Sequence, residues 1–241
     1  MKKLNYIAFL LVLVFSCVVQ AVTFTSNTTI SASNKVYDGN DIVVDGCTVT
    51  INGIHDFNSL HITNNGVITH TAGDASFNLT ITGDMTIDSG SSINADGKGY
   101  ASDTGPGAGH VGFCGGSGGG YGGVGGYGCG VSGCGGYCLG GPTYGSLTEP
   151  TDLGSGGGRS GGSGGGAIRL TVGGALTVEG EVRACGQFTD SDSQCGGGSG
   201  GSIWITTGAL KGSGVIVADG GNGGDGLRGW GWGKDRSLLR G

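Results

Sequence analysis

Charged residues are scarce in this chain, and their scarcity narrows the classes of function that are open to it. Asp, Glu, Lys and Arg together make up 12% of the 241 residues. Beyond Lys2 and Lys3, 18 acidic residues stand against 10 basic ones, so no basic patch could follow a phosphate backbone. We therefore expect no nucleic-acid partner.

The chain also lacks a sustained apolar period of 3.6 residues beyond its N-terminus, and we predict no helices there. No later apolar run is long enough to cross a bilayer, so we expect no transmembrane segment. Glycine accounts for 60 of the 241 residues but follows no strict Gly-X-Y period, which excludes a collagen.

The N-terminus has the pattern of an export signal. Two lysines precede an apolar run, and Val19-Gln20-Ala21 then offers a small-residue cleavage site. The apolar run is too short for a membrane anchor. A lipobox that ends at Cys17 is the alternative. We predict a secreted or cell-surface protein whose mature chain begins at Val22.

Seven cysteines follow the signal, and four of them lie where glycine leaves little apolar material for a core. Exported chains of this kind commonly use disulfides. A zinc site is the alternative, but the cysteines near residue 134 lack paired C-x2-C spacing. We predict disulfides and no cofactor, with one cysteine left unpaired or bonded between chains. The candidates are Cys185 with Cys195 across a short polar loop, and Cys114, Cys129, Cys134 and Cys138 in the glycine-rich block.

Short β-branched segments and an internal repeat indicate the fold. Residues 22–98 alternate apolar and polar side chains, with Gly, Asn or Asp between the segments. Strand-like segments that begin at Phe77, Ala167 and Ser202 each lead to an apolar-x-Ala-x-Gly ending, at residues 93–97, 182–186 and 216–220. Stacked copies would place Ile93, Val182 and Ile216 in one inward column. We predict an all-β parallel β-solenoid (β-helix). The alternative, a β-sandwich, does not explain the shared ending.

A glycine-rich block interrupts this repeat, with 30 glycines between residues 101 and 166. Tyr121, Val124, Tyr127 and Tyr137 recur at near-threefold spacing, which favours extended, polyproline-II-like segments that pack side by side. A flexible coil is the alternative. The predicted organisation is a signal peptide (1–21), solenoid strands (22–98), a glycine-rich insertion (99–166), further solenoid repeats (167–226) and a tail (227–241).

The tail departs from the repeat, because it holds two of the three tryptophans and no strand pattern. A shift of one nucleotide could restore a glycine run followed by a strand. We interpret residues 227–241 as a frameshifted or truncated end.

Several glycine-rich motifs resemble a known group of proteins. Gly105-Pro-Gly-Ala-Gly, Gly164-Gly-Gly-Ala-Ile-Arg-Leu and Gly198-x-Gly-Gly-Ser-Ile-Trp-Ile are similar to segments of large, glycine-rich, β-helix-forming secreted or cell-surface proteins of bacterial or protist type. The resemblance covers about residues 60–224. It implies an extracellular or surface-displayed solenoid and supplies no catalytic residue.

No constellation of catalytic or metal-binding residues stands out. G-x-S-x-G occurs twice, but a Gly/Ser tract produces it by chance. One calcium nonapeptide match at residues 220–227 is not a tandem array. Asp38, Asp41 and Asp45 fit turn positions, and His55, His61, His70 and His110 show no metal spacing.

We therefore predict a non-enzymatic structural or adhesive protein that makes weak multivalent contacts with glycans, extracellular matrix or other chains. The first alternative is a β-helix that binds or cleaves acidic polysaccharides, with Arg169, Arg183, Glu179, Glu181, Asp190 and Asp192 as its candidates. The second is ice binding through the outward threonines Thr80, Thr82 and Thr171, which are few and irregular.

Overall fold

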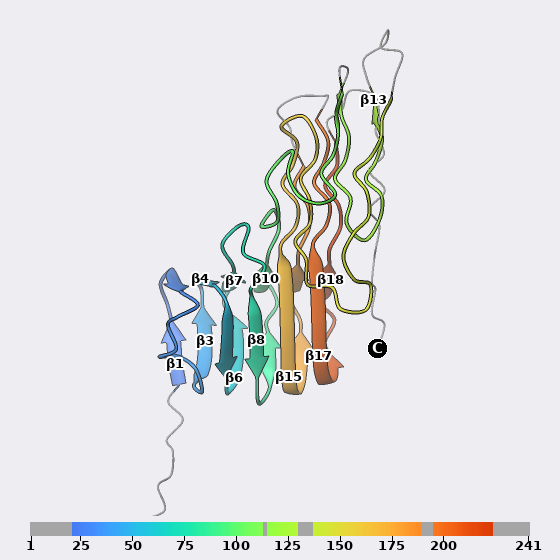
Figure 1. The fold of residues 1–241 in the computed structure, drawn as a ribbon. Helices are drawn as coiled ribbons and strands as arrows, with labels where there is room; N and C mark the ends of the chain where they lie inside the picture. The colour runs from blue at the N-terminus through green and yellow to red at the C-terminus, as the bar shows by residue number, and fades with distance from the viewer. Residues whose placement is uncertain (1–20, 113–114, 130–136, 189–194, 224–241) are drawn as a thin grey trace, which may run out of the picture.

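The computed structural model describes residues 21–112, 115–129, 137–188 and 195–223. All regular secondary structure in these ranges is β-structure, as predicted (Figure 1). Since no described segment is helical, none forms a helix that could span a membrane. The predicted signal peptide, apart from Ala21, and the predicted tail lie outside the described residues.

Two parallel sheets form the body of the described chain, and the larger one has eight strands. Its longest strand, β15, joins two groups of shorter strands, because β8 pairs with the first half of β15 and β9 with the second half. The strands of this sheet are β1 (Ala21–Phe24), β3 (Asp41–Asp45), β5 (Ile54–Phe57), β6 (Ser59–Thr63), β8 (Asn78–Ile81), β9 (Met85–Ile87), β15 (Ala167–Val178) and β17 (Ser202–Lys211).

The second parallel sheet has six strands in the described residues, and their spatial order follows their order in the chain. They are β2 (Thr28–Ile30), β4 (Thr48–Ile51), β7 (Val67–Thr69), β10 (Ser92–Asn94), β16 (Glu181–Arg183) and β18 (Val215–Val217). Two short antiparallel pairs lie in the glycine-rich region: β11 (Val111–Gly112) with β12 (Gly115–Gly116), and β13 (Gly128–Cys129) with β14 (Tyr137–Cys138).

The chain thus forms layers, each of which gives strands to both sheets before the next layer begins. Figure 1 shows the layers in sequence order, from β1 at one end to β17 and β18 at the other. Residues from both sheets join a single buried apolar cluster, so the sheets face each other across one core. The alternation of buried and outward residues along β3, β4 and β6 is the period-two pattern noted in the sequence.

Like residues stack on like residues in the core, because successive strands pair in parallel and in register. Ile93 pairs with Val182, and Val182 pairs with Ile216. Ile93 and Val182 are fully buried, while Ile216 packs against the core from the last described layer. The predicted inward column is therefore confirmed. The alanines of the three repeat endings, Ala95, Ala184 and Ala218, also contact this core.

The glycine-rich segments form a second packed unit beyond the ends of the strands (Figure 1). Residues 153–158 lie buried at its centre. Their backbone bonds to segments on several sides: Gly154 N donates to Gly165 O at 2.8 Å, Gly156 N to Thr104 O at 3.0 Å and Gly158 N to Ser117 O at 2.9 Å. We call this unit the glycine bundle; it comprises the described parts of residues 99–166, 185–201 and 219–223. Its segments pack side by side through these backbone hydrogen bonds.

Close approach of backbones explains why the bundle needs glycine. Among its described glycines in 99–166, only Gly105 and Gly145 have φ in the left-handed region, so backbone conformation is not the common reason. A methyl group on Gly164 would lie 2.0 Å from Gly154 O, and one on Gly158 would lie 2.3 Å from His110 O. The segments therefore contact each other where any side chain would stand.

We expect Val182→Asp to prevent or strongly weaken folding, because Val182 is 0% exposed and an unpaired carboxylate there would be buried. The cost is about 3–5 kcal/mol, which should lower the melting temperature by about 10 °C or more. Val36→Asp is the matched control, since Val36 is 70% exposed. Thermal denaturation followed by circular dichroism tests both; equal melting of Val182→Asp and the parent chain would show that the described register is wrong.

Gly158→Ala should destabilise the bundle by about 1–3 kcal/mol, because the added methyl group overlaps the backbone of His110. Gly122→Ala should be neutral or stabilising by up to about 1 kcal/mol, since nothing lies within 4 Å of its new methyl group. Proteolysis of the bundle and thermal melting measure the difference. If both variants behave alike, close backbone packing is not what requires glycine at residue 158.

Candidate functional site

A groove lies between the glycine bundle and the last described strand of the larger sheet. Its volume is about 500 Å³, and its walls come from segments 118–126, 144–150, 197–203 and 218–221. Glycine backbone forms most of the surface of the groove, with Tyr121, Tyr144, Leu147 and Pro150 at one side. We call this hollow the glycine groove.

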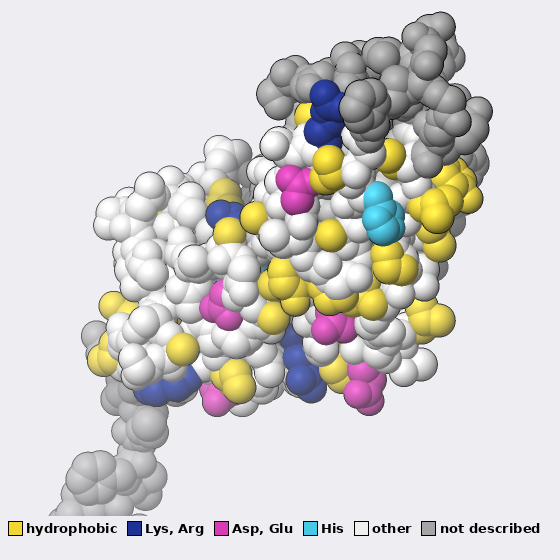
Figure 2. Space-filling view, turned by 45° about the horizontal axis from the view of Figure 1, so that its top comes forward, with side chains coloured by type: hydrophobic (Ala, Val, Ile, Leu, Met, Phe, Trp, Pro, Cys, Tyr) yellow, Lys and Arg dark blue, Asp and Glu magenta, His cyan; other side chains and the backbone are white. Residues whose placement is uncertain are grey.

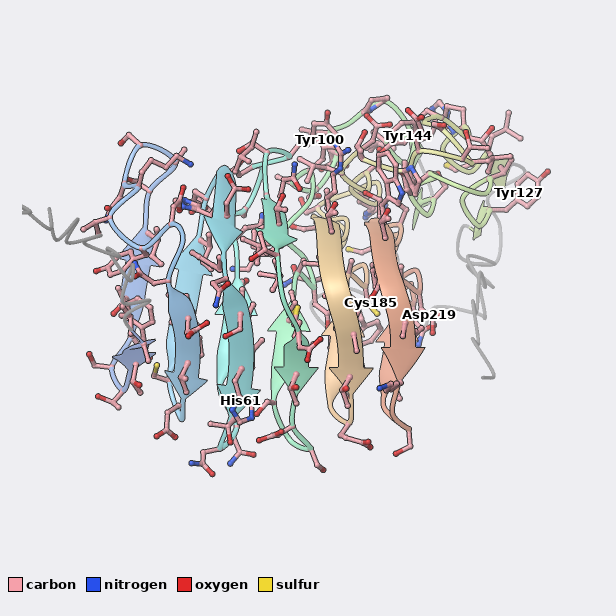
Figure 3. All side chains as sticks on the ribbon, turned by 90° about the horizontal axis from the view of Figure 1, so that it is seen from below. His61, Tyr100, Tyr127, Tyr144, Cys185 and Asp219 are labelled. Carbon is pink, nitrogen blue, oxygen red and sulfur yellow. The ribbon has the colours of Figure 1, made fainter. Side chains whose placement is uncertain are left out.

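Two tyrosines form the rigid side of the groove. The Tyr121 and Tyr144 rings meet edge to face, with centroids 4.9 Å apart. Tyr144 Oη donates to Leu153 O and accepts from Ser155 Oγ at 2.8 Å, which ties the ring to the centre of the bundle. Figure 3 shows Tyr144 beyond the ends of the strands, within the bundle. Burial raises the pKa of both phenols, so both are neutral donors at physiological pH.

Tyr121 carries an unsatisfied hydroxyl. The residue is 9% exposed, and its Oη has no hydrogen-bond partner among the described residues. The Ser202 hydroxyl donates instead to Asp152 O at 2.7 Å. The hydroxyl is shielded from solvent, close to Ser202 and to the Asp152 backbone, so it belongs to the interior of the bundle and is not an exposed donor of the groove.

The tyrosine pattern of the sequence is only partly reproduced. The sequence placed Tyr121, Val124 and Tyr127 on one edge, but Tyr121 is buried while Val124 and Tyr127 are 57% and 61% exposed. The chain bends at Gly122-Gly123, where Tyr121 N donates to Gly123 O, and this bend breaks the threefold repeat. The Tyr137 side chain lies outside the described structure.

The polysaccharide-cleaving candidates are not brought together. Arg169 belongs to β15 in the larger sheet and stacks 4.3 Å above the Trp204 ring. Arg183 belongs to β16 in the other sheet, where it bonds Asp96 at 2.6 Å and Glu181 at 2.9 Å. Glu181, followed by Asp96, raises the pKa of Arg183. Glu179 accepts from Ser213, and Asp190 and Asp192 lie outside the described residues.

The cysteines that the structure describes do not form the predicted bridge. Cys185 is a free thiol, so it is not bonded to Cys195, and Cys47 and Cys138 are free as well. Burial, aided by the negative charges of Asp96 and Asp219, raises the pKa of the Cys185 thiol and disfavours a reactive thiolate. Figure 3 shows Cys185 and Asp219 near each other. Cys114 and Cys134 lie outside the described residues, as does the side chain of Cys129.

The aspartates and histidines have local partners. Asp41 accepts from Ser59 and Asn58, which lower its pKa, and Asp45 accepts from Asn64. His55 Nδ1 contacts Asp38 at 2.8 Å, whereas His61 on the outer surface contacts Asp88 at 2.9 Å (Figure 3). No group of three metal-ligating side chains occurs in the described parts of the chain.

The outward threonines form a short column instead of a flat array. Thr80 pairs with Thr171, and Thr171 pairs with Thr206. The same column begins with Asp56, and Arg169 stacks on Trp204 beside it. A charged residue and a bulky ring therefore interrupt the surface that ordered water would require.

No protein-family model, curated protein or solved structure matches this chain. Its class is therefore defined by its own architecture: an all-β protein with parallel sheets and a packed glycine bundle.

We expect stability to fall as the pH drops below about 6.5, because His70 is buried. Burial lowers the pKa of His70, opposed by its bond to Thr71 O and the charge of Asp74 and aided by Lys98. The unfolded chain then binds the proton more readily, so the contribution is complete above pH 6.5 and declines below it. His70→Leu should flatten the dependence of the melting temperature on pH between pH 7.5 and 5, while Val36→Ser, which changes an exposed residue without a titratable group, should leave the slope unchanged. An unaltered slope in His70→Leu would contradict the assignment.

Proposed function

We propose that this chain is an exported, non-catalytic β-solenoid that serves as a structural or adhesive protein. Its layers would form the rigid axis of the solenoid, and the glycine bundle would be its contact surface. The observation that carries the proposal is the composition of the bundle, whose interior is mostly glycine backbone and which exposes several large apolar side chains.

The bundle exposes several of its apolar side chains, while Tyr121 and Leu153 are buried within it. Val111, Tyr127 and Leu139 are 64%, 61% and 64% exposed. Figure 2 shows hydrophobic side chains at several points of this part of the surface. Scattered apolar groups on a rigid support favour many weak contacts over one strong one, because each contact buries little area.

The arrangement of charges supports a binding role more than catalysis. The two arginines that could hold an acidic polysaccharide extend from different sheets, and Arg183 is occupied by Asp96 and Glu181. The aromatic and glycine-lined groove has no acid–base pair in its lining. Contact with glycans, matrix or other chains therefore fits the described surface better than cleavage does.

The test compares the binding of the monomeric protein with that of the protein displayed at high density on beads. The targets are a glycan array and immobilised extracellular-matrix proteins. We expect binding by the beads and little binding by the monomer. The triple variant Val111→Ser, Tyr127→Ser, Leu139→Ser should reduce bead binding at least about tenfold, as expected when several weak contacts are lost together.

The matched control changes Val36, Ile54 and Val215 to Ser, at positions 70%, 55% and 50% exposed outside the bundle. It should bind like the parent chain. Release of reducing ends from acidic polysaccharides would refute the non-catalytic role, and equal binding by both triple variants would refute the bundle as contact surface.

A further inference from the structure

We propose that the last described layer binds one further strand–strand–glycine layer, supplied by another polypeptide that carries the same kind of repeat. The surface consists of the outer edges of β17 and β18 together with the glycine groove. The three exposed side chains of the adhesive test, Val111, Tyr127 and Leu139, lie outside the lining of this groove, so the two proposals can fail separately.

The outer edges of β17 and β18 have no strand partner within the described chain. β15 and β16 are paired along both edges, whereas β17 pairs only with β15 and β18 only with β16. A parallel edge of this kind presents backbone donors and acceptors to an incoming strand.

Apolar residues of the last layer are only partly covered. Ile203, Ile205 and Ile216 pack against the core but keep intermediate exposure. Their partners one layer inward, Ile168, Leu170 and Val182, are 1%, 1% and 0% exposed. This difference in exposure is what we expect if one further layer normally covers the last one. The strands of that further layer would need the same apolar-x-apolar pattern.

The groove continues the glycine bundle by one position. Gly165 is bonded on two sides, since its amide donates to Ser199 O and its carbonyl accepts from Gly154 N. Gly200 occupies the equivalent place in the next layer, because Ala167 pairs with Ser202. Gly200 makes no hydrogen bond to any described residue, although it lines the groove.

The glycine segment that follows the strands of the second sheet also loses its hydrogen-bond partners in the last layer. Gly186 N donates to Asp219 O at 2.8 Å, which links its layer to the next. Gly220 is the corresponding residue one layer later, and its amide has no acceptor among the described residues. The amides of Gly200 and Gly220 therefore need acceptors, which a ligand rich in backbone carbonyls would supply.

The residues that line the groove indicate what kind of polypeptide could bind there. Elsewhere in the bundle, extended glycine segments approach so closely that a methyl group on Gly197 would lie 2.0 Å from Gly221 O. An extended glycine-rich segment can approach in that way and supply carbonyls. The first layer of a second copy, β1 and β2, could meet the strand edges, but residues 21–38 contain no glycine for the groove. A different chain with the full repeat therefore fits best.

The test uses the full chain and a fluorescent synthetic peptide with the sequence of residues 196–218, which is one complete layer. Fluorescence anisotropy should show saturable binding. Gly122→Trp should weaken it at least about tenfold, because Gly122 lines the groove and an added Cβ there meets nothing within 4 Å, so the backbone accepts a side chain whose ring should obstruct the groove. Unchanged thermal melting of this variant confirms that it folds.

Two matched controls define the contacts. Leu139→Ser, outside the groove lining, should bind the peptide like the parent chain, whereas Leu147→Ser, inside it, should bind more weakly. A peptide that carries Ile203→Asp and Ile205→Asp should not bind, because its strand can no longer cover the core.

Absence of saturable binding, or equal binding by Gly122→Trp, would overturn the proposal. Binding seen only with a chain that ends at Gly223 would overturn it too, since residues 224–241 would then be the occupant. Sedimentation equilibrium tests the remaining alternative. If the chain alone forms a dimer and Gly122→Trp abolishes it, the partner is a second copy of this chain and the proposal is wrong.

Discussion

Parallel hydrogen bonding between successive layers is the constraint on which the rest of this protein depends. Each strand pairs with the equivalent strand of the next layer, so a residue type that suits one layer suits the next. The core becomes a set of columns, such as Val49, Ile68, Ile93, Val182 and Ile216. Repetition in the chain therefore becomes continuity in space.

The same layers support two interiors that obey opposite rules. Between the sheets, branched apolar side chains fill the space and the backbone lies outside. In the glycine bundle, backbones fill most of the space and few side chains enter it, because contacts such as Gly164 with Gly154 leave no room for a methyl group. Small polar residues are tolerated where they bond to the neighbouring segments, as Ser155 does with Gly107 and Tyr144.

This inversion joins the fold to the proposed role. A unit with so little interior space for side chains leaves Val111, Tyr127 and Leu139 outside. The groove arises at the edge of the same unit, where the last layer leaves Gly200 and the Gly220 amide without partners among the described residues. The proposed adhesive role and the proposed binding of a further layer thus both depend on the way this unit packs.

The repeat was predictable from sequence because its signals are local and recur. Ile93, Val182 and Ile216 share the same neighbours in the chain, and parallel pairing then places them in one column. The all-β class followed from short β-branched segments and from the missing helical period. The predicted disulfide of Cys185 failed because cysteine spacing says nothing of distance in space; the thiol packs beside Val217 instead.

By itself, the sequence determined which residues form strands, which of them face the core and where glycine is required, since these depend on side-chain size and alternation. Only the tertiary structure decided that Arg169 and Arg183 belong to different sheets, that Tyr121 turns inward while Tyr127 stays outside, and that Leu147 and Pro150 meet Gly200 across a groove. Each of these contacts joins segments that lie tens of residues apart in the chain. Many are made by glycine backbone, and a glycine has no side chain from which its contact partner could be predicted.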